Sequence, residues 1–375
     1  AYCDEVNPVL WLKQGSIISA LIATVLLISF KILATITGKN RTRLAVIFPP
    51  LIIITLLVLS GLVLMQGVIL TYGAYLAESY AIERVHFVLI GLIGFGAILG
   101  ALAILSSLLQ FVKKNSHSVV GTKLQEEHHP KLFELVKTIS DELGAKQPDH
   151  IVVGLEPNFY VTSTDVQVIG EQASLEGETL YLSLPLARIL STEELKAIVG
   201  HELGHFRGKD TYYSLKFSPV YSGIGQALKS LDTKSDEDAR SIALLPAIAV
   251  LSYMMDVFHT NVSSVNRDRE FEADKAASEV ARPEALASSL LKIGLYASEW
   301  YSLQEVFIER LRKGRKTMNL PLLFASFIKY DVNEDNIPEH IKAIAEQTIS
   351  HPTDSHPPTS LRIEKLGLDI EKIEK

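Results

Sequence analysis

Three long apolar stretches, separated by short polar loops, dominate the first third of the chain. They cover residues 16–36, 51–72 and 87–112. Each is long enough to cross a hydrocarbon core of about 30 Å, which takes about 20 residues of helix. Lys31 lies near the end of the first stretch, where a long side chain can reach the lipid headgroups. The pattern predicts a membrane region over residues 1–115 with three transmembrane helices.

From about residue 116 the pattern becomes that of a mixed globular domain. Residues 130–144 have apolar positions at helical spacing and end at Gly144, which is typical of a helix C-terminus. The runs "HIVVGL" and "ETLYLSL" are typical of strands, and "NFYVTSTDVQVIGE" between them can supply another. His128 and His129 are adjacent and point about 100° apart on a helix, so we interpret them as a solvated helix start. The order of elements predicts an α+β fold, mainly helical with a small β-sheet, over residues 116–375.

The composition supports a membrane protein and argues against a nucleic-acid-binding protein. Hydrophobic residues make up 47% of the chain and the mean hydropathy is +0.21, both high for a soluble protein. The formal net charge of -7 offers no basic field to hold nucleic acid, so we expect no nucleic-acid partner. Cys3 is the single cysteine, which excludes an internal disulfide and a cysteine-based zinc site. Any metal must then be held by His, Asp or Glu.

The basic residues predict how the membrane region is oriented. The loop "GKNRTR" follows the first stretch and the pair "KK" follows the third, whereas the segment before the first stretch carries Asp4 and Glu5. Cytoplasmic loops carry the excess of Lys and Arg in membrane proteins. We therefore expect the N-terminus outside and everything after Lys114 in the cytoplasm.

The stretch "STEELKAIVGHELGHFRGKD" carries the first candidate chemistry. Ser191 and Glu194 form a capping-box pattern, which predicts a helix through the motif. On that helix His201 and His205 lie one turn apart on one face, close enough to bind one Zn²⁺. Glu202 lies beside that face, where it could act as general base towards a metal-activated water. The alternative is two surface histidines that happen to lie one turn apart.

Two glycine patterns predict close contacts between helices. Gly96 and Gly100, in the third uncharged stretch, are spaced so that another helix could approach that face. Gly204 lies between the two motif histidines, although glycine costs a helix about 1 kcal/mol relative to alanine. We expect another part of the chain to approach the helix closely there.

Two histidines leave a catalytic zinc one protein ligand short, since such sites use three and a water. Downstream, "NRDREFEADKAASEV" has a helical pattern and places Glu270 and Asp274 four residues apart on one face. Glu270 can ligate a metal. Asp274 can then accept the free ring N–H of a zinc-bound histidine and fix its tautomer. The alternative is a charged helix that faces solvent.

Together these features resemble the HtpX-like and CAAX prenyl endopeptidase family of integral-membrane zinc metallopeptidases. The resemblance rests on several membrane helices, "HELGH", "REFEAD" about 65 residues later and a C-terminal "SHPPTSLRIEKL", and it covers residues from about 128 to 370. It implies a zincin-like fold for the peptidase domain. It also implies that His201, His205 and Glu270 bind one Zn²⁺ and that Glu202 is the catalytic base.

Three further site residues follow from the resemblance. The run "PNFYV" around Asn158 resembles a family segment that precedes the active-site helix, which implies substrate binding, although two aromatic residues stand where the family has a small one. His356 and Arg362 match the family's C-terminal His-Pro and Arg pattern. His356 could donate to the oxyanion at the scissile carbonyl, and Arg362 could pair with a site carboxylate. Alternatively, "HPPTS" only makes a turn and caps the last helix through Thr359.

The resulting interpretation is a membrane-bound zinc endopeptidase that hydrolyses peptide bonds of misfolded or regulatory membrane proteins. Its partners would be polypeptide substrates and the lipid bilayer of a bacterial inner (cell) membrane, and a substrate could add as a strand to the sheet edge near residues 151–164. A CAAX-type prenyl-protein endopeptidase is the alternative within the family, and the smaller set of spans argues against it. A catalytically silent adaptor with a structural zinc is the alternative from another class, but such zinc sites use four protein ligands.

A shared zinc constrains the topology between its ligands. The run "SIALLPAIAVLSYMM", residues 241–255, is uncharged but short for a full crossing. If it crossed alone, His205 and Glu270 would lie on opposite sides of the membrane, so the intervening chain must cross an even number of times. Zero crossings leave a helix that is buried or lies on the membrane. Two crossings make a membrane hairpin over residues 212–258 with "DTKSDEDAR" outside, which is the alternative we prefer.

Overall fold

The computed structural model describes residues 2–81, 83–112, 116–207, 217, 239–315, 319–330, 337–346 and 357–373. The chain forms two compact units. Unit 1 comprises Ala1–Lys114 with Lys216–Val262, and unit 2 comprises Asn115–Leu215 with Ser263–Lys375. Each unit is therefore built from two separate segments of the chain.

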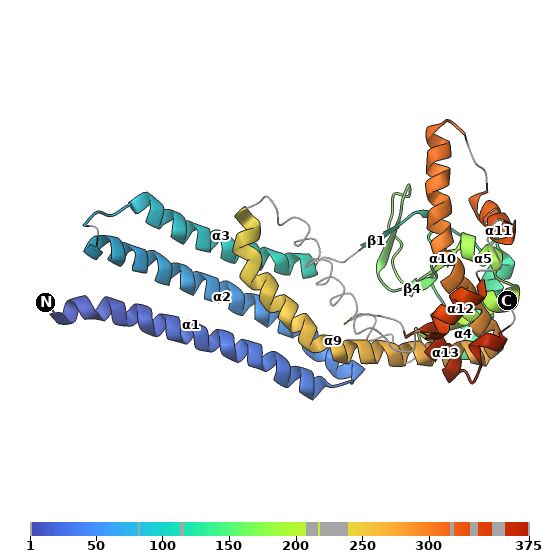
Figure 1. Ribbon diagram of the computed structural model, residues 1–375, viewed down its shortest axis with the longest axis horizontal. Helices are drawn as coiled ribbons and strands as arrows, with labels where there is room; N and C mark the ends of the chain where they lie inside the picture. Colours follow the sequence, from blue (N-terminus) through green and yellow to red (C-terminus); the bar gives the residue numbers. More distant parts are fainter. Residues whose placement is uncertain are drawn as a thin grey trace. The chain divides into compact units, whose positions relative to one another are not determined.

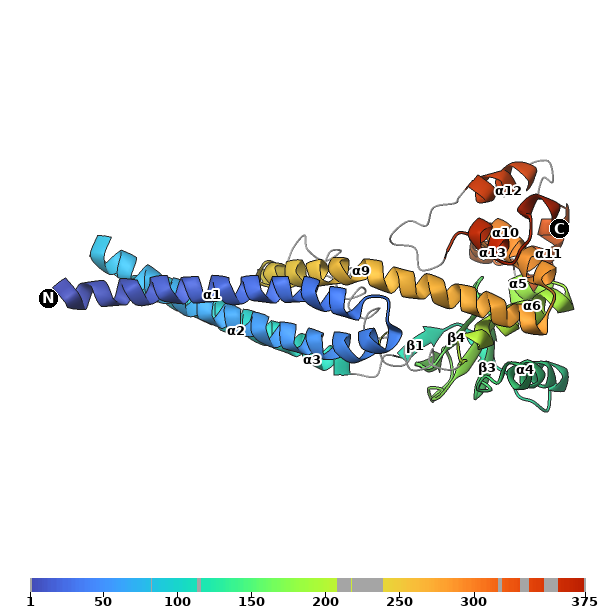
Figure 2. The ribbon, with the colours of Figure 1, turned by 90° about the horizontal axis from the view of Figure 1, so that it is seen from below.

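Unit 1 contains three long apolar helices, α1 (Tyr2–Thr37), α2 (Arg41–Ala81) and α3 (Phe87–Val112). Figures 1 and 2 show the three helices side by side. Among the described residues, three helices are long and apolar enough to cross a membrane, over Asn7–Thr37, Arg41–Tyr80 and Phe87–Ser106. The three predicted apolar stretches are confirmed as helices. Helices α1 and α2 extend well beyond the predicted stretches because the helical backbone continues through their polar flanks.

Small and polar side chains join these helices. A Cβ atom added at Gly67 of α2 would clash with Ala97 of α3, whereas at Gly96 no described atom lies within 4 Å of such an added Cβ. Of the predicted pair Gly96 and Gly100, Gly96 makes no such close approach, and α2 supplies the glycine at this contact between α2 and α3. Gln66 Nε2 of α2 also donates to Ser19 Oγ of α1 over 2.7 Å.

The long helix α9 (Ala239–Val280) contributes its first half to unit 1. The apolar run proposed as the second limb of a membrane hairpin lies in this half. Tyr253 packs near Phe30 of α1 and Phe258 packs on Phe48 of α2, with ring centroids 6.3 and 5.2 Å apart. The second limb thus lies on a helix that packs against α1 and α2. The first limb, 212–228, lies outside the described residues apart from position 217.

Unit 2 contains a four-stranded sheet in the order β2-β3-β6-β4 and a separate pair β1-β5. The strands are β1 (Ser116–Val119), β2 (Gly121–Lys123), β3 (His150–Gly154), β4 (Tyr160–Thr162), β5 (Asp165–Val168) and β6 (Thr179–Ser183). Strands β3 and β6 run parallel, whereas β2 and β4 are antiparallel to their neighbours. Strand β4 therefore forms one edge of the sheet.

The strands at "HIVVGL" and "ETLYLSL" are confirmed as β3 and β6. The run between them forms two strands, β4 and β5, where the sequence predicted one. A local turn separates them, since Thr162 Oγ1 accepts from the Thr164 N–H over 3.1 Å. Threonine side chains that bond nearby backbone in this way compete with the regular hydrogen bonding of a strand.

Helix α4 (Pro130–Leu143) is confirmed to end before Gly144. Gly144 adopts the left-handed conformation, with φ at 59°, and its N–H donates to the last carbonyls of the helix. His129 occupies the N-cap, and both His128 and His129 are exposed. The pair is a solvated helix start, as predicted.

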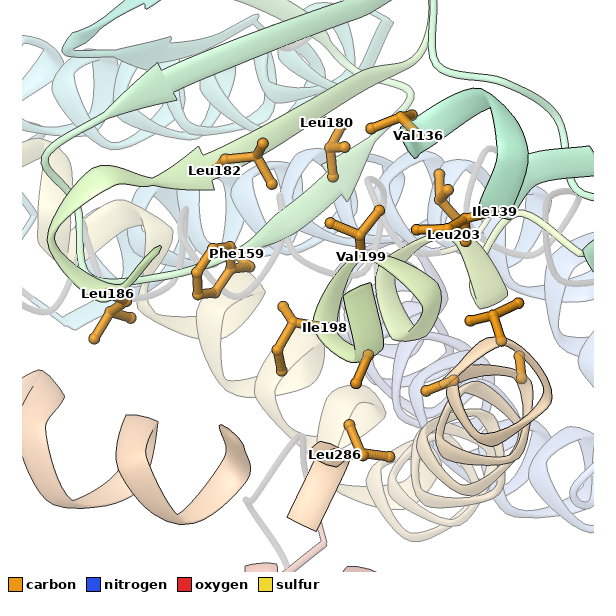
Figure 3. Close-up of a cluster of buried hydrophobic side chains, with 14 of the residues drawn as sticks. Val136, Ile139, Phe159, Leu180, Leu182, Leu186, Ile198, Val199, Leu203 and Leu286 are labelled. Atoms are coloured by element: carbon orange, nitrogen blue, oxygen red, sulfur yellow. The ribbon is translucent and has the colours of Figure 1, made fainter. Parts of the chain in front are cut away.

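The core of unit 2 forms around α6 (Thr192–Gly204), which contacts α4 and the sheet. Figure 3 shows Val199 and Leu203 of α6 in one buried cluster with Leu180 of β6 and with Val136 and Ile139 of α4. The other helices are α5 (Leu184–Ile189), α10 (Pro283–Arg312), α11 (Leu320–Tyr330), α12 (Ile337–Glu346), α13 (Thr359–Lys365) and the short η2 (Ile370–Lys372). The described residues thus confirm a mainly helical α+β fold with small sheets.

Candidate metal centre

Helix α6 begins as its sequence predicts. The Ser191 side chain accepts from the Glu194 N–H over 3.3 Å, and the Glu194 carboxylate accepts from the Ser191 N–H over 2.7 Å. Glu194 also accepts from Ser288 Oγ over 2.6 Å and from Lys292 Nζ over 2.9 Å, both on α10. Burial opposes ionisation of Glu194, but the hydrogen bonds from Lys292, Ser288 and Ser191 outweigh burial and lower its pKa. The start of the helix is therefore fixed both by its cap and by α10.

The two motif histidines lie at the other end of α6. The helix ends at Gly204, and His205 occupies the C-cap position with φ at -68° and ψ at -17°, which is still helical. His201 and His205 consequently stay on one face, with ring centroids 5.0 Å apart. His201 is buried and His205 is partly buried. The prediction that a helix carries the motif is confirmed through Gly204.

Helix α9 approaches α6 at two glycines. A Cβ added at Gly204 would lie 3.1 Å from the Cα of Ala273, and one added at Gly200 would lie 3.3 Å from the Cα of Ala277. Both distances are shorter than the roughly 3.5–4.0 Å at which carbon atoms normally pack. The close approach predicted at Gly204 is confirmed. It brings the second half of α9, which carries Glu270, against the helix of the two histidines.

Glu270 completes a cluster of three possible metal ligands. Its Oε2 lies 3.6 Å from Nε2 of His201, and its Oε1 lies 3.5 Å from Nε2 of His205. One ligand atom from each of the three residues lies within 4.8 Å of the others. Two atoms bound at about 2.0–2.1 Å to one tetrahedral zinc ion are themselves roughly 3.3 Å apart. The observed separations and the donor types fit a shared zinc ion.

Asp274 lies behind His201 and orients its ring. The Asp274 carboxylate accepts from His201 Nδ1 over 2.9 Å, from Arg362 Nε over 2.9 Å and from Arg362 Nη2. Burial raises the pKa of Asp274, but the hydrogen bonds from Arg362 and His201 outweigh burial and lower it, so Asp274 is a carboxylate. A proton on Nδ1 leaves Nε2 of His201 to face Glu270. Arg362, on α13, is itself buried and pairs with a site carboxylate as the sequence suggested.

The alternative of a charged helix that faces solvent is wrong for the two acids of interest on α9. Glu270 is 6% exposed and Asp274 is 2% exposed. Other charged residues of this helix, such as Asp268 and Lys275, are exposed. The helix therefore has one solvated face and one face that supplies acids to the site.

Glu202 lies on the motif helix, and Asn158 adjoins a residue that packs against this helix. Glu202 is partly exposed on α6, between the two histidines in sequence. Asn158 is exposed and precedes Phe159, which is buried in the same cluster as Ile198 of α6 (Figure 3). Asn158 is thus held beside the motif helix at the start of the edge strand β4.

The two C-terminal candidates are His356 and Arg362. His356 lies outside the described residues, whereas Arg362 is placed as given above. Helix α13 begins at Thr359, with Pro358 at the N-cap and no side-chain cap hydrogen bond. The expectation that Thr359 caps this helix is therefore wrong, because Thr359 is already its first helical residue.

Sequence reasoning missed three residues that support the site. Ser288 and Lys292 hold Glu194 across 94 and 98 positions of sequence, and no local pattern could pair them. Gly200 was also missed, although it has a readable signal. It lies four residues before Gly204, so the two glycines share one face of the helix.

Comparison with known proteins agrees with this geometry. The sequence profile of peptidase family M48 matches residues 131–368. This range includes α6, the second half of α9 and α13, which together hold the candidate ligands and Arg362. The chain therefore belongs to peptidase family M48, and it is a membrane-bound metalloprotease.

Curated relatives carry the name of one protease of this family. A protein named Protease HtpX homolog from Archaeoglobus fulgidus is 25% identical over 78% of this chain and 82% of its own length. The protein of the same name from Thermococcus kodakarensis is 24% identical over 65% of this chain and 74% of its own length. Protease HtpX homolog 2 from Sulfurisphaera tokodaii is 30% identical over 48% of this chain and 55% of its own length. No solved structure gives a significant match.

Proposed function

We propose that the metal is zinc, one ion per chain, held by His201, His205 and Glu270, and that Glu202 is the general base of an endopeptidase. The observation that carries this proposal is the convergence of two imidazole nitrogens and one carboxylate within 4.8 Å. Two His and one Glu are a known ligand set of catalytic zinc sites, which keep a fourth position open for water. A structural zinc in an adaptor would use four protein ligands, and the cluster found among the described residues has three.

We also propose roles for the side chains around the metal ligands. When bound, zinc would lower the pKa of a water molecule towards neutrality and polarise the scissile carbonyl. Glu202 would take a proton from the attacking water and deliver it to the leaving amine. Asp274 would hold His201 in the tautomer whose Nε2 can bind metal. Arg362 would keep Asp274 ionised and in position.

Substrate positioning is the role we propose for Asn158, strand β4 and His356. Strand β4 is at the edge of the four-stranded sheet, and an extended polypeptide could pair with such an edge through its main chain. Asn158 lies two residues before this strand and could bind the main chain of the peptide. His356 would donate to the oxyanion that forms at the scissile carbonyl.

The substrates we propose are misfolded or regulatory membrane proteins, cut on the cytoplasmic side of the cell membrane, the inner membrane in a bacterium. Residues 1–115 would form the membrane region and residues 116–375 the peptidase domain, with a further membrane hairpin over 212–258. The basic loops after the first and third apolar stretches support this orientation. The three candidate membrane spans found among the described residues are a smaller set than we expect of an enzyme for prenylated CAAX proteins, which favours the first substrate class.

Replacing the proposed base separates metal binding from catalysis. Purified protein should contain one zinc per chain by elemental analysis. Glu202→Gln should keep that zinc, because it removes no ligand, while cleavage of casein falls by about 10²–10⁴-fold.

Glu193→Gln is the matched control, since Glu193 is an exposed acid in the first turn of the same helix. It should retain both zinc and activity. Near-normal casein cleavage by Glu202→Gln would refute the assigned base, and a different metal at full activity would refute zinc.

A further inference from the structure

The end of α10 and helix α11 expose most of the large hydrophobic side chains that lie on the surface of the described part of unit 2. We call residues 301–315 and 319–330 the α10–α11 arm. Tyr301, Ile308 and Leu311 are exposed on α10, and Leu322, Leu323 and Tyr330 are exposed on α11, with exposed fractions from 38% to 74%. Figure 1 shows the last turns of α10 projecting from the other elements of unit 2. Hydrophobic side chains gathered in this way commonly mark a site of interaction with a partner or a membrane.

One face of the arm packs against other parts of unit 2, and another face is exposed. Trp300 and Phe307 of α10 are buried, and the Trp300 ring lies 5.5 Å from that of Phe324 on α11. Tyr301 and Ile308 are seven residues apart, so they share the exposed face of α10. The arm therefore has two apolar surfaces, one packed within unit 2 and one directed to the surroundings.

The tip of the arm is basic. Residues 309–315 contain Arg310, Arg312, Lys313 and Arg315, all exposed, and one acid, Glu309, which pairs with Lys313 at 3.0 Å. Four cations and one anion give this segment a formal charge of +3, in a chain whose net charge is -7. The positive charge is thus a local feature of the arm and opposes the overall charge of the protein.

We propose that the α10–α11 arm is a lipid-binding site that docks on an anionic membrane surface. The basic tip would bind lipid phosphates, and the apolar side chains would enter the boundary between headgroups and acyl chains. Helical segments that combine Lys and Arg with exposed apolar and aromatic residues bind membranes in this manner. An acidic soluble protein would match the cations but would leave the apolar face without a partner of its kind. Because the chain is already anchored in the bilayer, even a weak site would be occupied at the high effective concentration that tethering gives.

The test measures contact between the arm and lipid in the full-length protein. With Cys3 replaced by alanine, a single cysteine at Ile308 carries an environment-sensitive fluorophore, and the protein is reconstituted into vesicles that contain a lipid-attached quencher. Vesicles of phosphatidylcholine with phosphatidylglycerol should quench the probe strongly, and vesicles of phosphatidylcholine alone should quench it weakly. A matched probe at Lys137, which is exposed on α4, should be quenched weakly in both.

Replacing cations at the tip of the arm tests whether the probe is quenched because the arm binds lipid or only because it lies near the membrane. Arg312→Gln, Lys313→Gln and Arg315→Gln together should reduce the binding constant of the arm on the order of a hundredfold, since each cation near an anionic leaflet contributes roughly a factor of five. The control removes three exposed cations elsewhere in unit 2, Lys131, Lys137 and Arg188, with the probe at Ile308, and should change nothing.

Three outcomes would overturn the proposal. The first is equal quenching at Ile308 and Lys137 in anionic vesicles, and the second is quenching at Ile308 that survives the triple substitution. The third is shielding of the probe only after casein is added, which would make the arm a substrate-docking surface. Because the readout is quenching and requires no catalysis, its result is independent of the zinc and general-base assignments.

Discussion

Asp274 is the residue at which three segments of the site meet. Its carboxylate lies on α9 and accepts hydrogen bonds from His201 on α6 and from Arg362 on α13. Loss of one partner from a buried ion pair leaves an uncompensated charge, which is strongly destabilising. The orientation of His201 therefore depends on a residue outside the three-residue cluster of possible metal ligands.

Asp274→Asn should weaken zinc binding about 10–100-fold. The amide carries no charge to hold Arg362, and it can present an N–H instead of an oxygen to His201. Zinc affinity, measured by competition with a chelator, tests this. Asp268→Asn, an exposed acid on the same helix, should leave the affinity unchanged. If the two variants bind zinc equally well, Asp274 does not orient the ligand.

Spacing along the chain was enough to predict the geometry of most of these residues. The four-residue separations of His201 from His205 and of Glu270 from Asp274 place each pair on one helix face. Arg362 was different, because the sequence left open whether its segment served the site or only a turn. It reaches Asp274 across 88 positions, a contact that no local pattern encodes.

At the scale of elements, the contact between α6 and α9 depends on glycine. An alanine at position 204 would place its Cβ 2.9 Å from the Cβ of Ala276 and 3.1 Å from the Cα of Ala273. The Cα atom belongs to the backbone of α9, so it cannot move aside as the end of a long side chain could. The two helices that carry the ligands would have to separate.

Gly204→Ala should lower the free energy of unfolding by about 1–3 kcal/mol, the usual cost of overpacking a core. In an unconstrained helix the same change would stabilise by up to about 1 kcal/mol. Thermal unfolding of the detergent-solubilised protein shows whether Gly204→Ala stabilises or destabilises it. Gly294→Ala on α10 is the control, because an added Cβ there would lie 3.9 Å from Ile344 Cδ1, an ordinary packing distance. Gly314→Ala is not suitable because Gly314 has a positive φ. Stabilisation by Gly204→Ala would show that the helices are not in close contact there.

Local signals predicted the elements well where they act within a few residues. The capping box of α6 and the left-handed Gly144 after α4 are both such signals. The misses depended on wider context. A threonine turn divided one expected strand into two, and the close contact between α2 and α3 used Gly67 instead of Gly96 because the partner helix decides which small residue is needed.

At the scale of the whole molecule, α9 bears on both the membrane topology and the candidate metal site. It is a single helix of 42 residues, so its length is about 63 Å at 1.5 Å per residue. A bilayer core of about 30 Å takes up roughly half of that length. One helix is therefore long enough to serve as the second limb of the proposed hairpin and also to carry Glu270 and Asp274.

A cysteine at Asp236, with Cys3 replaced, should be labelled by a membrane-impermeant reagent from outside intact cells. This position precedes α9 and lies in the loop that the proposed hairpin places outside. A cysteine at Lys131 on α4 is the control and should react only after the cells are opened. Labelling of position 236 only from inside would eliminate the hairpin and leave α9 without a crossing.

Arg362 is also the last of these residues to be made. It follows His201 by 161 positions and Asp274 by 88 positions. At a synthesis rate of about 5–20 residues per second, roughly 4–18 s pass between the appearance of Asp274 and that of its cationic partner. During this interval the nascent chain already contains the three apolar helices and both ligand segments, but not the pair that orients His201. The order of synthesis thus places the apolar helices and the candidate ligands on the nascent chain before the residue that completes the ion pair behind His201.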